Sequence, residues 1–284
     1  MSLKSKTRVI LRSHGITPSK RLGQSFLIDD GILRKMVSYA SLSKEDTVLE
    51  AGAGLGFLTE CLADVAGQVI AVEIDLRLID VLKDRLRSCG NVRLMQGDIL
   101  KLTIPSFDKV VSTPPYSMSS PLLFWLFEKK FELAVLAFQE EFASRLAASV
   151  GSKDYGRLTI AAYYRAEVEL LDRVQKELFW PSPNVDSRIV RLKPRKAPFS
   201  VDDESFFFEM VNAVFTQRNK KLRNAVMPLF SKYRMPKAEA RGLADSLPFH
   251  SRRPRELSPE EINLVAQEAA KMLKDAGVFR KNVA

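Results

Sequence analysis

A glycine-rich loop is the first part of the sequence whose residue types and spacing could bind a nucleoside. Glu50-Ala-Gly-Ala-Gly-Leu-Gly56 follows an apolar run, and Gly52 and Gly54 allow the sharp turn with which a backbone approaches a ligand. Because position 57 is Phe, the G-x-G-x-x-G spacing of dinucleotide-binding proteins is broken. Together with the acid at Glu50, this pattern favours a methyl-donor site over a nicotinamide site, and a purely structural glycine turn is the alternative.

Two further acids follow the next two apolar runs. Glu73 lies about 20 residues past Gly52, where a carboxylate can accept both hydroxyls of a ribose. Asp75 is expected to cap the next helix instead. Asp98 can accept a hydrogen bond from an adenine amine while Ile99 packs on the ring. Either acid alone could be surface decoration, but the ordered set predicts an adenosyl ligand at the carboxyl ends of the first strands.

A second loop, Ser112-Thr-Pro-Pro-Tyr116, is suited to holding a flat base. Its two prolines fix the backbone, and the Tyr116 ring can stack on a base. The loop resembles the [Asn/Asp/Ser]-Pro-Pro-Tyr signature of methyltransferases that act on exocyclic amines. That resemblance implies that the Thr113 side chain and a proline carbonyl, at Pro114, accept the amine hydrogens. Positioning would then supply much of the barrier reduction, and a sulfonium methyl donor needs no strong base.

These loops require a scaffold of strands and helices, and the hydrophobic pattern supplies one. Short runs rich in Val, Ile and Leu alternate with helical stretches, which predicts an α/β, doubly wound, Rossmann-like domain with a mostly parallel seven-stranded sheet. The expected helices include Phe57–Ala66, Arg77–Ser88 and Pro121–Lys130. The expected strands are Thr47–Ala51, Val69–Ile74, Val92–Gln96, Phe107–Ser112, Leu133–Gln139, Val168–Val174 and Arg188–Leu192.

The pattern changes after Leu192. Lys193–Pro198 is typical of a linker, and helical periodicity follows it. We therefore expect a methyltransferase domain over residues 1–197, with a basic arm over 1–28, and a small all-helical domain over 198–284. The helices expected in the second domain are Glu204–Phe215, Leu222–Phe230, Lys237–Ser246 and a last one capped by Ser258.

Composition narrows the class of protein. The net charge is +10, six bases precede the first acid at Asp29, and residues 200–284 carry 15 bases against 11 acids. Basic ends around a neutral centre suggest phosphate-binding surfaces, with ordinary solvated lysines as the alternative. Two distant cysteines suggest neither a disulfide nor a metal site, and no apolar run suggests a membrane span or a signal peptide. A cytoplasmic protein is expected.

The motifs together carry a resemblance that covers nearly the whole chain. The chain resembles the KsgA/Dim family of small-subunit ribosomal RNA adenine dimethyltransferases. The segments that carry it are Leu22–Leu27, Glu50–Gly56, Val72–Asp75, Gly97-Asp98, the Thr-Pro-Pro-Tyr loop, Gly151–Arg157, Phe179–Ser187 and Phe215–Asn224.

The resemblance implies S-adenosylmethionine as the cofactor, with contacts at Ser25, Leu27, Gly52, Glu73, Asp98 and Thr113. Two positions depart from the family. Ser25 stands where relatives commonly carry Asn or His, and Thr113 stands where they carry Asn. A threonine hydroxyl reaches one bond less far than an amide oxygen and is β-branched, so alignment of the amine could be poorer. Methyl transfer is expected, at a rate that Thr113 could reduce.

The resemblance also implies small-subunit rRNA in an immature 30S-type particle as the partner of a monomeric enzyme. The target adenine must be unpaired or flipped out, and Tyr116 and Phe179 are the candidate stacking faces, with core packing as the alternative for Phe179. A basic cluster is expected to bind RNA phosphates, with a solvated helix face as the alternative. Its residues are Arg218, Lys220, Lys221, Arg223, Arg252 and Arg253.

Three other functions are weighed against this one. A sister family methylates an adenine of large-subunit rRNA with the same fold, but Gly151–Arg157 and the basic helical tail favour the small subunit. A ribosome-assembly factor that has lost transfer through Thr113 is a second alternative. A dehydrogenase is the third, and the missing glycine at position 57 argues against it.

Overall fold

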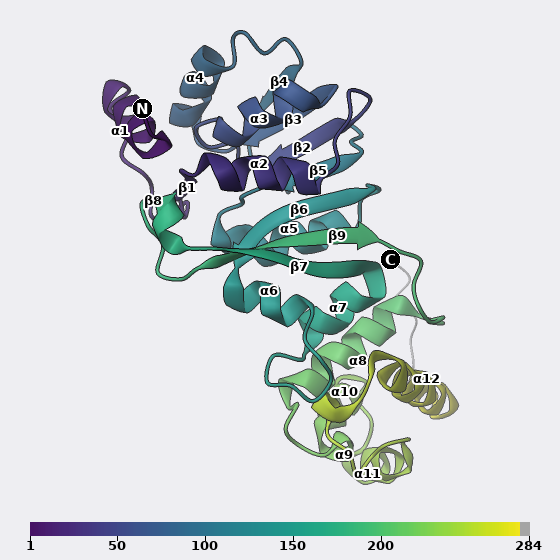
Figure 1. Ribbon diagram of the computed structural model, residues 1–284. Coiled ribbons are helices and arrows are strands. Elements are labelled where there is room, and N and C mark those ends of the chain that lie inside the picture. The colour runs from purple at the N-terminus through teal and green to yellow at the C-terminus, as the bar shows by residue number, and fades with distance from the viewer. Residues whose placement is uncertain (279–284) are drawn as a thin grey trace. The chain divides into compact units, whose positions relative to one another are not determined.

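The computed structural model describes residues 1–278, and residues 47–194 contain a seven-stranded sheet (Figure 1). The strand order is β4-β3-β2-β5-β6-β9-β7. Strands β2 to β6 pair in parallel, and β9 pairs antiparallel with β6. The expected α/β, mostly parallel sheet is confirmed. The strands are β2 (Thr47–Ala51), β3 (Gln68–Glu73), β4 (Val92–Gln96), β5 (Lys109–Ser112), β6 (Leu133–Gln139), β7 (Ala166–Val174) and β9 (Ser187–Pro194).

Three central strands, β2, β3 and β6, are buried along most of their length because both faces of the sheet are covered. In β6, residues 134–138 are all buried, and β3 is buried from Val69 to Glu73. The parallel register sets Ala51 opposite Val72, and Glu73 opposite Gln96. The loops that follow β2, β3 and β4 therefore leave the sheet at one edge, where ligands bind in sheets of this kind.

Strand boundaries follow the apolar runs closely. The bounds of β2, β4 and β6 are those predicted from the sequence. Strand β5 begins at Lys109 rather than Phe107, and the carboxylate of Asp108, just before the strand, accepts the backbone N–H of Thr47. Strand β3 ends at Glu73, because the carboxylate of Glu73 binds the backbone N–H groups of Ile74 and Asp75.

The helices around the sheet include α3 (Phe57–Val65), α4 (Leu76–Arg85) and α5 (Ser119–Phe127). All three were expected, although α5 begins two residues before Pro121. Four helices and a small two-stranded sheet were not predicted. These elements are α1 (Leu3–Ser13), α2 (Asp30–Tyr39), α6 (Glu140–Leu146), α7 (Arg157–Arg165), β1 (Phe26–Leu27) and β8 (Phe179–Trp180).

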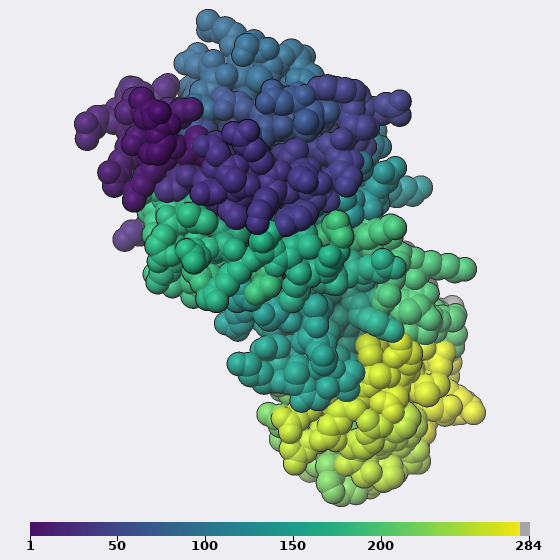
Figure 2. Space-filling view, viewed as in Figure 1, coloured from purple at the N-terminus to yellow at the C-terminus, as the bar shows by residue number. Residues whose placement is uncertain are grey.

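The basic arm expected over residues 1–28 contains the ordered helix α1. Ser2 caps the helix by accepting the backbone N–H of Ser5, and Leu3, Thr7 and Leu11 form its buried face. Spacing of four residues places these three side chains on one side, and the lysines and arginines on the exposed side. Figure 2 shows α1, in dark purple, on the outer surface.

The chain divides into two compact units, one formed by residues 1–143 and 167–194. The second unit takes Ser144–Ala166 together with the chain from Arg195 onward. The first domain predicted from the sequence, residues 1–197, includes the segment 144–166. The structure groups this segment with the second unit because Tyr155 and Ile160 belong to its hydrophobic core, and the Tyr155 hydroxyl donates to the Leu257 carbonyl over 2.8 Å.

The second unit is helical, as expected. Ser258 caps the last helix by accepting the backbone N–H of Glu261. The single helix expected over Leu222–Phe230 is instead two helices, because Pro228 lacks a backbone N–H and fits only the first turn of a new helix. The helices of this part are α8 (Glu204–Thr216), α9 (Leu222–Ala225), α10 (Met227–Lys232), α11 (Lys237–Ser246) and α12 (Pro259–Asp275).

Within residues 1–278, no helix has both the length and the apolar character needed to cross a membrane. The same residues contain no cluster of three or more His, Cys, Asp or Glu side chains that could hold a metal ion.

Candidate functional site

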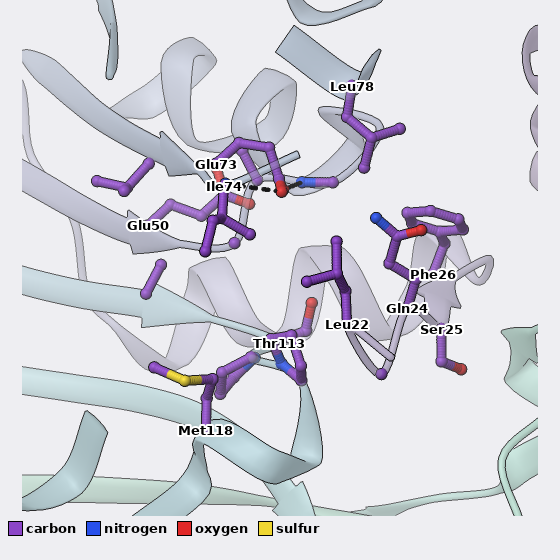
Figure 3. Close-up of a pocket in the computed structure, with 18 of the residues that line it drawn as sticks. Leu22, Gln24, Ser25, Phe26, Glu50, Glu73, Ile74, Leu78, Thr113 and Met118 are labelled. Atoms are coloured by element: carbon purple, nitrogen blue, oxygen red, sulfur yellow. Dashed lines mark hydrogen bonds between the residues drawn. The ribbon is translucent and has the colours of Figure 1, made fainter. Parts of the chain in front are cut away.

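A cavity of about 310 Å³ opens at the carboxyl ends of β2 to β5, where the sequence predicts a nucleoside site (Figure 3). Its walls come from the first unit alone. Nine of the predicted site residues line it together, namely Ser25, Leu27, Gly52, Gly54, Glu73, Asp98, Ile99, Thr113 and Pro114.

The glycine loop forms one wall in a conformation that favours glycine. Gly52, Gly54 and Gly56 have φ angles of 84°, 59° and 82°. The loop is fastened to β3 because the Val72 carbonyl accepts the backbone N–H groups of Gly52 and Ala53. A Cβ at Gly54 would lie 3.2 Å from the ring of Phe26. The loop is therefore both pre-formed and too close to its neighbours for larger residues.

Glu73 is a buried carboxylate held by three backbone donors. Its Oε2 accepts the N–H of Gly54 at 2.8 Å (Figure 3). Its Oε1 accepts the N–H groups of Ile74 and Asp75, each at 2.9 Å. Burial raises the pKa of Glu73, while these three hydrogen bonds oppose the shift by stabilising the charged form. The carboxyl group is thus fixed in place with acceptor capacity left for a ligand hydroxyl.

Glu50 lines the same cavity and is more deeply buried than Glu73. It is 1% exposed, and the Thr59 hydroxyl donates to its Oε2 at 2.6 Å. Burial raises the pKa of Glu50 to about 8, and the nearby charge of Glu73 adds to the shift. Glu50 is therefore protonated at neutral pH, whereas the sequence distinguished it only as an acid before the glycine loop.

Asp98 and Ile99 face the cavity from the loop after β4. The Asp98 Oδ1 accepts the backbone N–H of Leu100 at 3.1 Å, which fixes the carboxylate while its side chain stays 29% exposed. Ile99 is buried against the same wall. An acceptor beside an apolar side chain is the arrangement expected for recognition of an adenine ring and its amine.

The Thr-Pro-Pro-Tyr loop forms the opposite wall, and Figure 3 shows Thr113 across the cavity from Glu73. The Ser112 hydroxyl donates to the Ala51 carbonyl at 2.6 Å, which ties this loop to the end of β2. Thr113 and Pro114 line the cavity. Tyr116 lies beyond the lining, and its hydroxyl is hydrogen-bonded to the Ser187 hydroxyl at 2.7 Å.

Residues from the N-terminal segment close the remaining side. The Gln24 amide donates to Asp75 Oδ2 at 2.7 Å and accepts the backbone N–H of Ser19. The Ser25 hydroxyl donates to the Pro181 carbonyl at 2.6 Å, away from the cavity centre. Sequence reasoning missed Arg21, Gln24 and Met118 as lining residues. Arg21 and Met118 belong to none of the motifs identified in the sequence. Gln24 lies in the Leu22–Leu27 motif, which is the one signal that could have indicated it.

Phe179 does not reach the cavity lining. It lies in β8 opposite Leu27, is 5% exposed, and belongs to the hydrophobic core of the first unit. The structure therefore places it where core packing, one of the two predicted roles, accounts for its burial.

The predicted RNA-binding cluster splits into two groups. Arg218 donates to the Tyr155 carbonyl at 3.1 Å, Arg223 pairs with Asp245 at 3.4 Å, and Arg252 pairs with Glu261 at 2.6 Å. These arginines are engaged by groups of the second unit. Within residues 1–278, the other three members are exposed and make no ion pair within 4 Å, and they are Lys220, Lys221 and Arg253.

Comparisons with known proteins identify the family of the chain. The ribosomal RNA adenine dimethylase family matches residues 17–267. A probable ribosomal RNA small subunit methyltransferase A of Methanosarcina mazei is 47% identical over 91% of this chain and 95% of its own length. A ribosomal RNA small subunit methyltransferase A of a Geobacillus strain is 43% identical over 77% of this chain and 80% of its own.

Solved structures show the same fold over most of the chain. A dimethyladenosine transferase from Plasmodium falciparum superposes with a TM-score of 0.76 at 31% identity, covering 87% of this chain and 98% of that one. The 23S rRNA methyltransferase ErmE superposes with a TM-score of 0.64 at 29% identity, covering 86% and 98%. From the family match and the identity of these relatives, the chain is a member of the ribosomal RNA adenine dimethylase family.

Proposed function

We propose that this chain transfers methyl groups from S-adenosylmethionine to the N6 amine of adenines in small-subunit rRNA, forming dimethyladenosine. One observation carries the proposal. Thr113 and Pro114 line the same cavity as Glu73 and Asp98, so the amine-holding loop and the nucleoside-binding acids share one space. The curated relatives at 43–47% identity are named for the small subunit.

The residues of the cavity fit S-adenosylmethionine. About 310 Å³ is within the range for a small-molecule site. Glu73 would accept the ribose hydroxyls, Asp98 the adenine amine, and Ile99 would pack on the ring. The backbone at Gly52 and Gly54, together with Ser25 and Leu27, would surround the rest of the molecule. When bound, the cofactor supplies a methyl group already activated on a sulfonium.

The protein's contribution to transfer is to hold the target amine. The Thr113 hydroxyl and the Pro114 carbonyl oxygen accept one amine hydrogen each, which points the nitrogen lone pair toward the cofactor side of the cavity. The prolines keep these acceptors from moving, so the cost of alignment is met when the loop folds. Tyr116 stacks on the adenine. Phe179, which is buried, supports β1 and Leu27 beneath the site rather than stacking.

RNA is held by charge. The side chains of Lys220, Lys221 and Arg253 make no ion pair with an acid among residues 1–278, which leaves them available for phosphates of an immature small subunit. Hydrogen bonds from Leu222 to the Arg252 carbonyl and from Arg223 to the His250 carbonyl bring the two segments that carry them together. We propose that the protein acts as a monomer, because the RNA supplies the binding surface. We also propose that it acts in the cytoplasm, where ribosomes assemble.

The test is methyl transfer from tritiated S-adenosylmethionine to immature small subunits that lack the modification, with large subunits as the matched control. Labelling of adenines in the small subunit alone is the expected result. Labelling of the large subunit instead would support the activity named for ErmE, the structural neighbour at 29% identity.

A second candidate function follows from Thr113. A shorter, β-branched side chain in the amine-holding loop would favour an assembly factor that binds the cofactor and RNA but transfers slowly. Cofactor binding and small-subunit binding without labelling would favour this candidate.

A further inference from the structure

Tyr116 is held at its far end by a residue 71 positions later in the sequence. A hydrogen bond of 2.7 Å joins the Tyr116 hydroxyl and the Ser187 hydroxyl. Ser187 is fully buried and begins β9, where it stands opposite Gln139 at the end of β6. In the part of the chain that the structure describes, Tyr116 is the one hydrogen-bond partner of the Ser187 side chain.

The backbone around Ser187 is itself fixed. The Asp186 carbonyl accepts the backbone N–H of Glu140, and the Asp186 carboxylate accepts the backbone N–H of Lys176 and the guanidinium of Arg173. Ser187 therefore sits at a point where three segments of the first unit converge, and its hydroxyl has a defined position.

The Tyr116 hydroxyl is in a state that suits this contact. Burial raises the pKa of Tyr116, the hydrogen bond with Ser187 lowers it, and the charge of Asp186 raises it. The hydroxyl is therefore neutral at physiological pH and can donate or accept. At its other end, the ring is attached to a backbone that Pro114 and Pro115 make rigid.

Two anchors fix the ring plane. A tyrosine ring rotates about two side-chain torsions, and a backbone restraint alone leaves both free. A hydrogen bond at the hydroxyl limits both torsions, because a swing of the ring would move the hydroxyl away from Ser187. Stacking on a base depends on the orientation of this plane.

We propose that Ser187 is a positioning residue, which acts through the Tyr116 hydroxyl to hold the ring in the orientation that stacks on the target adenine. The proposal deepens the proposed function and rests on it, because it assumes that Tyr116 contacts the base. Ser187 itself does not touch the substrate.

A double-mutant cycle tests the proposal with Ser187→Ala, Tyr116→Phe and the two combined. Each single change removes the same hydrogen bond, and Tyr116→Phe keeps the ring. We expect each to lower kcat by about three- to tenfold, and the double variant to be no slower than the slower single variant. The affinity for S-adenosylmethionine, measured by calorimetry, should stay unchanged, because neither residue lines the cavity.

Two further variants separate positioning from a general structural effect. Ser187→Thr keeps a hydroxyl and should recover most of the rate. Ser119→Ala removes another buried serine hydroxyl close to the same loop, one with no hydrogen-bond partner within residues 1–278, and should leave the rate unchanged. Thermal unfolding of every variant shows whether it folds.

A readout without methyl transfer uses RNA with 2-aminopurine at the target position. Stacking on the ring at position 116 quenches the fluorescence of the probe. Ser187→Ala should quench less than the wild type, whereas adding Ser187→Ala to Tyr116→Phe should cause no further loss of quenching. Rate losses that multiply in the double variant, or a folded Ser187→Ala protein with full rate and full quenching, would overturn the proposal. If the wild type quenches the probe and Ser187→Ala quenches it less, but neither labels small subunits, the proposed function is contradicted while the positioning role is supported.

Discussion

The backbone N–H of Gly54 donates to Glu73 Oε2 at 2.8 Å, so the glycine loop and the end of β3 are built as one unit. The same carboxylate binds the N–H groups of Ile74 and Asp75 through its other oxygen. A residue that the sequence indicates as a ribose acceptor therefore also shapes the wall of the cavity around the ribose.

Glu73→Gln should weaken binding of S-adenosylmethionine by at least about tenfold, because an amide has one acceptor oxygen and its NH2 group would face a backbone donor. Isothermal titration calorimetry with the cofactor alone measures the change. Asp80→Asn, an exposed change on α4, is the matched control and should bind as the wild type does. Unchanged affinity in Glu73→Gln would remove Glu73 from the site.

Stability should depend on pH through Glu50. Its ordinary pKa is 4.5 and its pKa in the folded chain is about 8. Between these values the unfolded chain loses the proton while the folded chain keeps it, so the free energy of unfolding falls as pH rises. The loss begins near pH 4.5 and is complete above pH 8, at up to about 5 kcal/mol.

Glu50→Gln keeps an acceptor for the Thr59 hydroxyl and cannot ionise, so its stability advantage over the wild type should grow from about pH 5 to about pH 8. Urea unfolding at several pH values measures this advantage. Glu128→Gln, at an exposed position, should follow the wild type. Parallel pH profiles for wild type and Glu50→Gln would show that Glu50 ionises normally in the folded chain.

Thr113→Asn should raise kcat for methyl transfer by about five- to tenfold, because the amide oxygen extends one bond further toward the amine. Single-turnover assays with small subunits measure the rate, and Thr113→Ala should be slower than the wild type. If the wild type transfers methyl groups and Thr113→Asn is no faster, threonine already aligns the amine, and the impaired assembly factor is ruled out.

Removal of the three unpaired charges at Lys220, Lys221 and Arg253 should weaken RNA binding and lower its dependence on salt. If each contacts one phosphate, the slope of log affinity against log salt should fall by about 2. Fluorescence anisotropy with labelled RNA over a range of salt measures both quantities. The control is the double variant Lys83→Ala and Arg87→Ala, which removes two charges that pair with Asp80 and Asp84. This control should leave the slope unchanged.

Much of the first unit could be predicted because its signals are local. The bounds of β2, β4 and β6 were predicted correctly, and the apolar run of β6 is the clearest example of a buried parallel strand. Seven of the nine site residues occupy one cavity because they lie at or just after the ends of β2 to β5, whereas Ser25 and Leu27 come from the N-terminal segment. The helix α1 was missed because its basic residues dominate the composition, whereas only Leu3, Thr7 and Leu11 show the buried face.

Features that depend on distant partners could not be predicted. The sequence does not show that Arg218, Arg223 and Arg252 are engaged by groups of the second unit. Nor does it show that segment 144–166 packs with helices some 100 residues later through Tyr155. The Tyr116–Ser187 contact joins two motifs that were noted separately, and only the fold brings them together.

The most direct measurement is mass spectrometry of nucleosides from small-subunit rRNA after incubation with this chain and S-adenosylmethionine that carries a deuterated methyl group. The account predicts adenosine with two deuterated methyl groups on N6, formed by the wild type and lost in Glu73→Gln at low cofactor concentration. Labelled nucleosides other than N6-methylated adenosine, or no label with either wild type or Thr113→Asn, would contradict it.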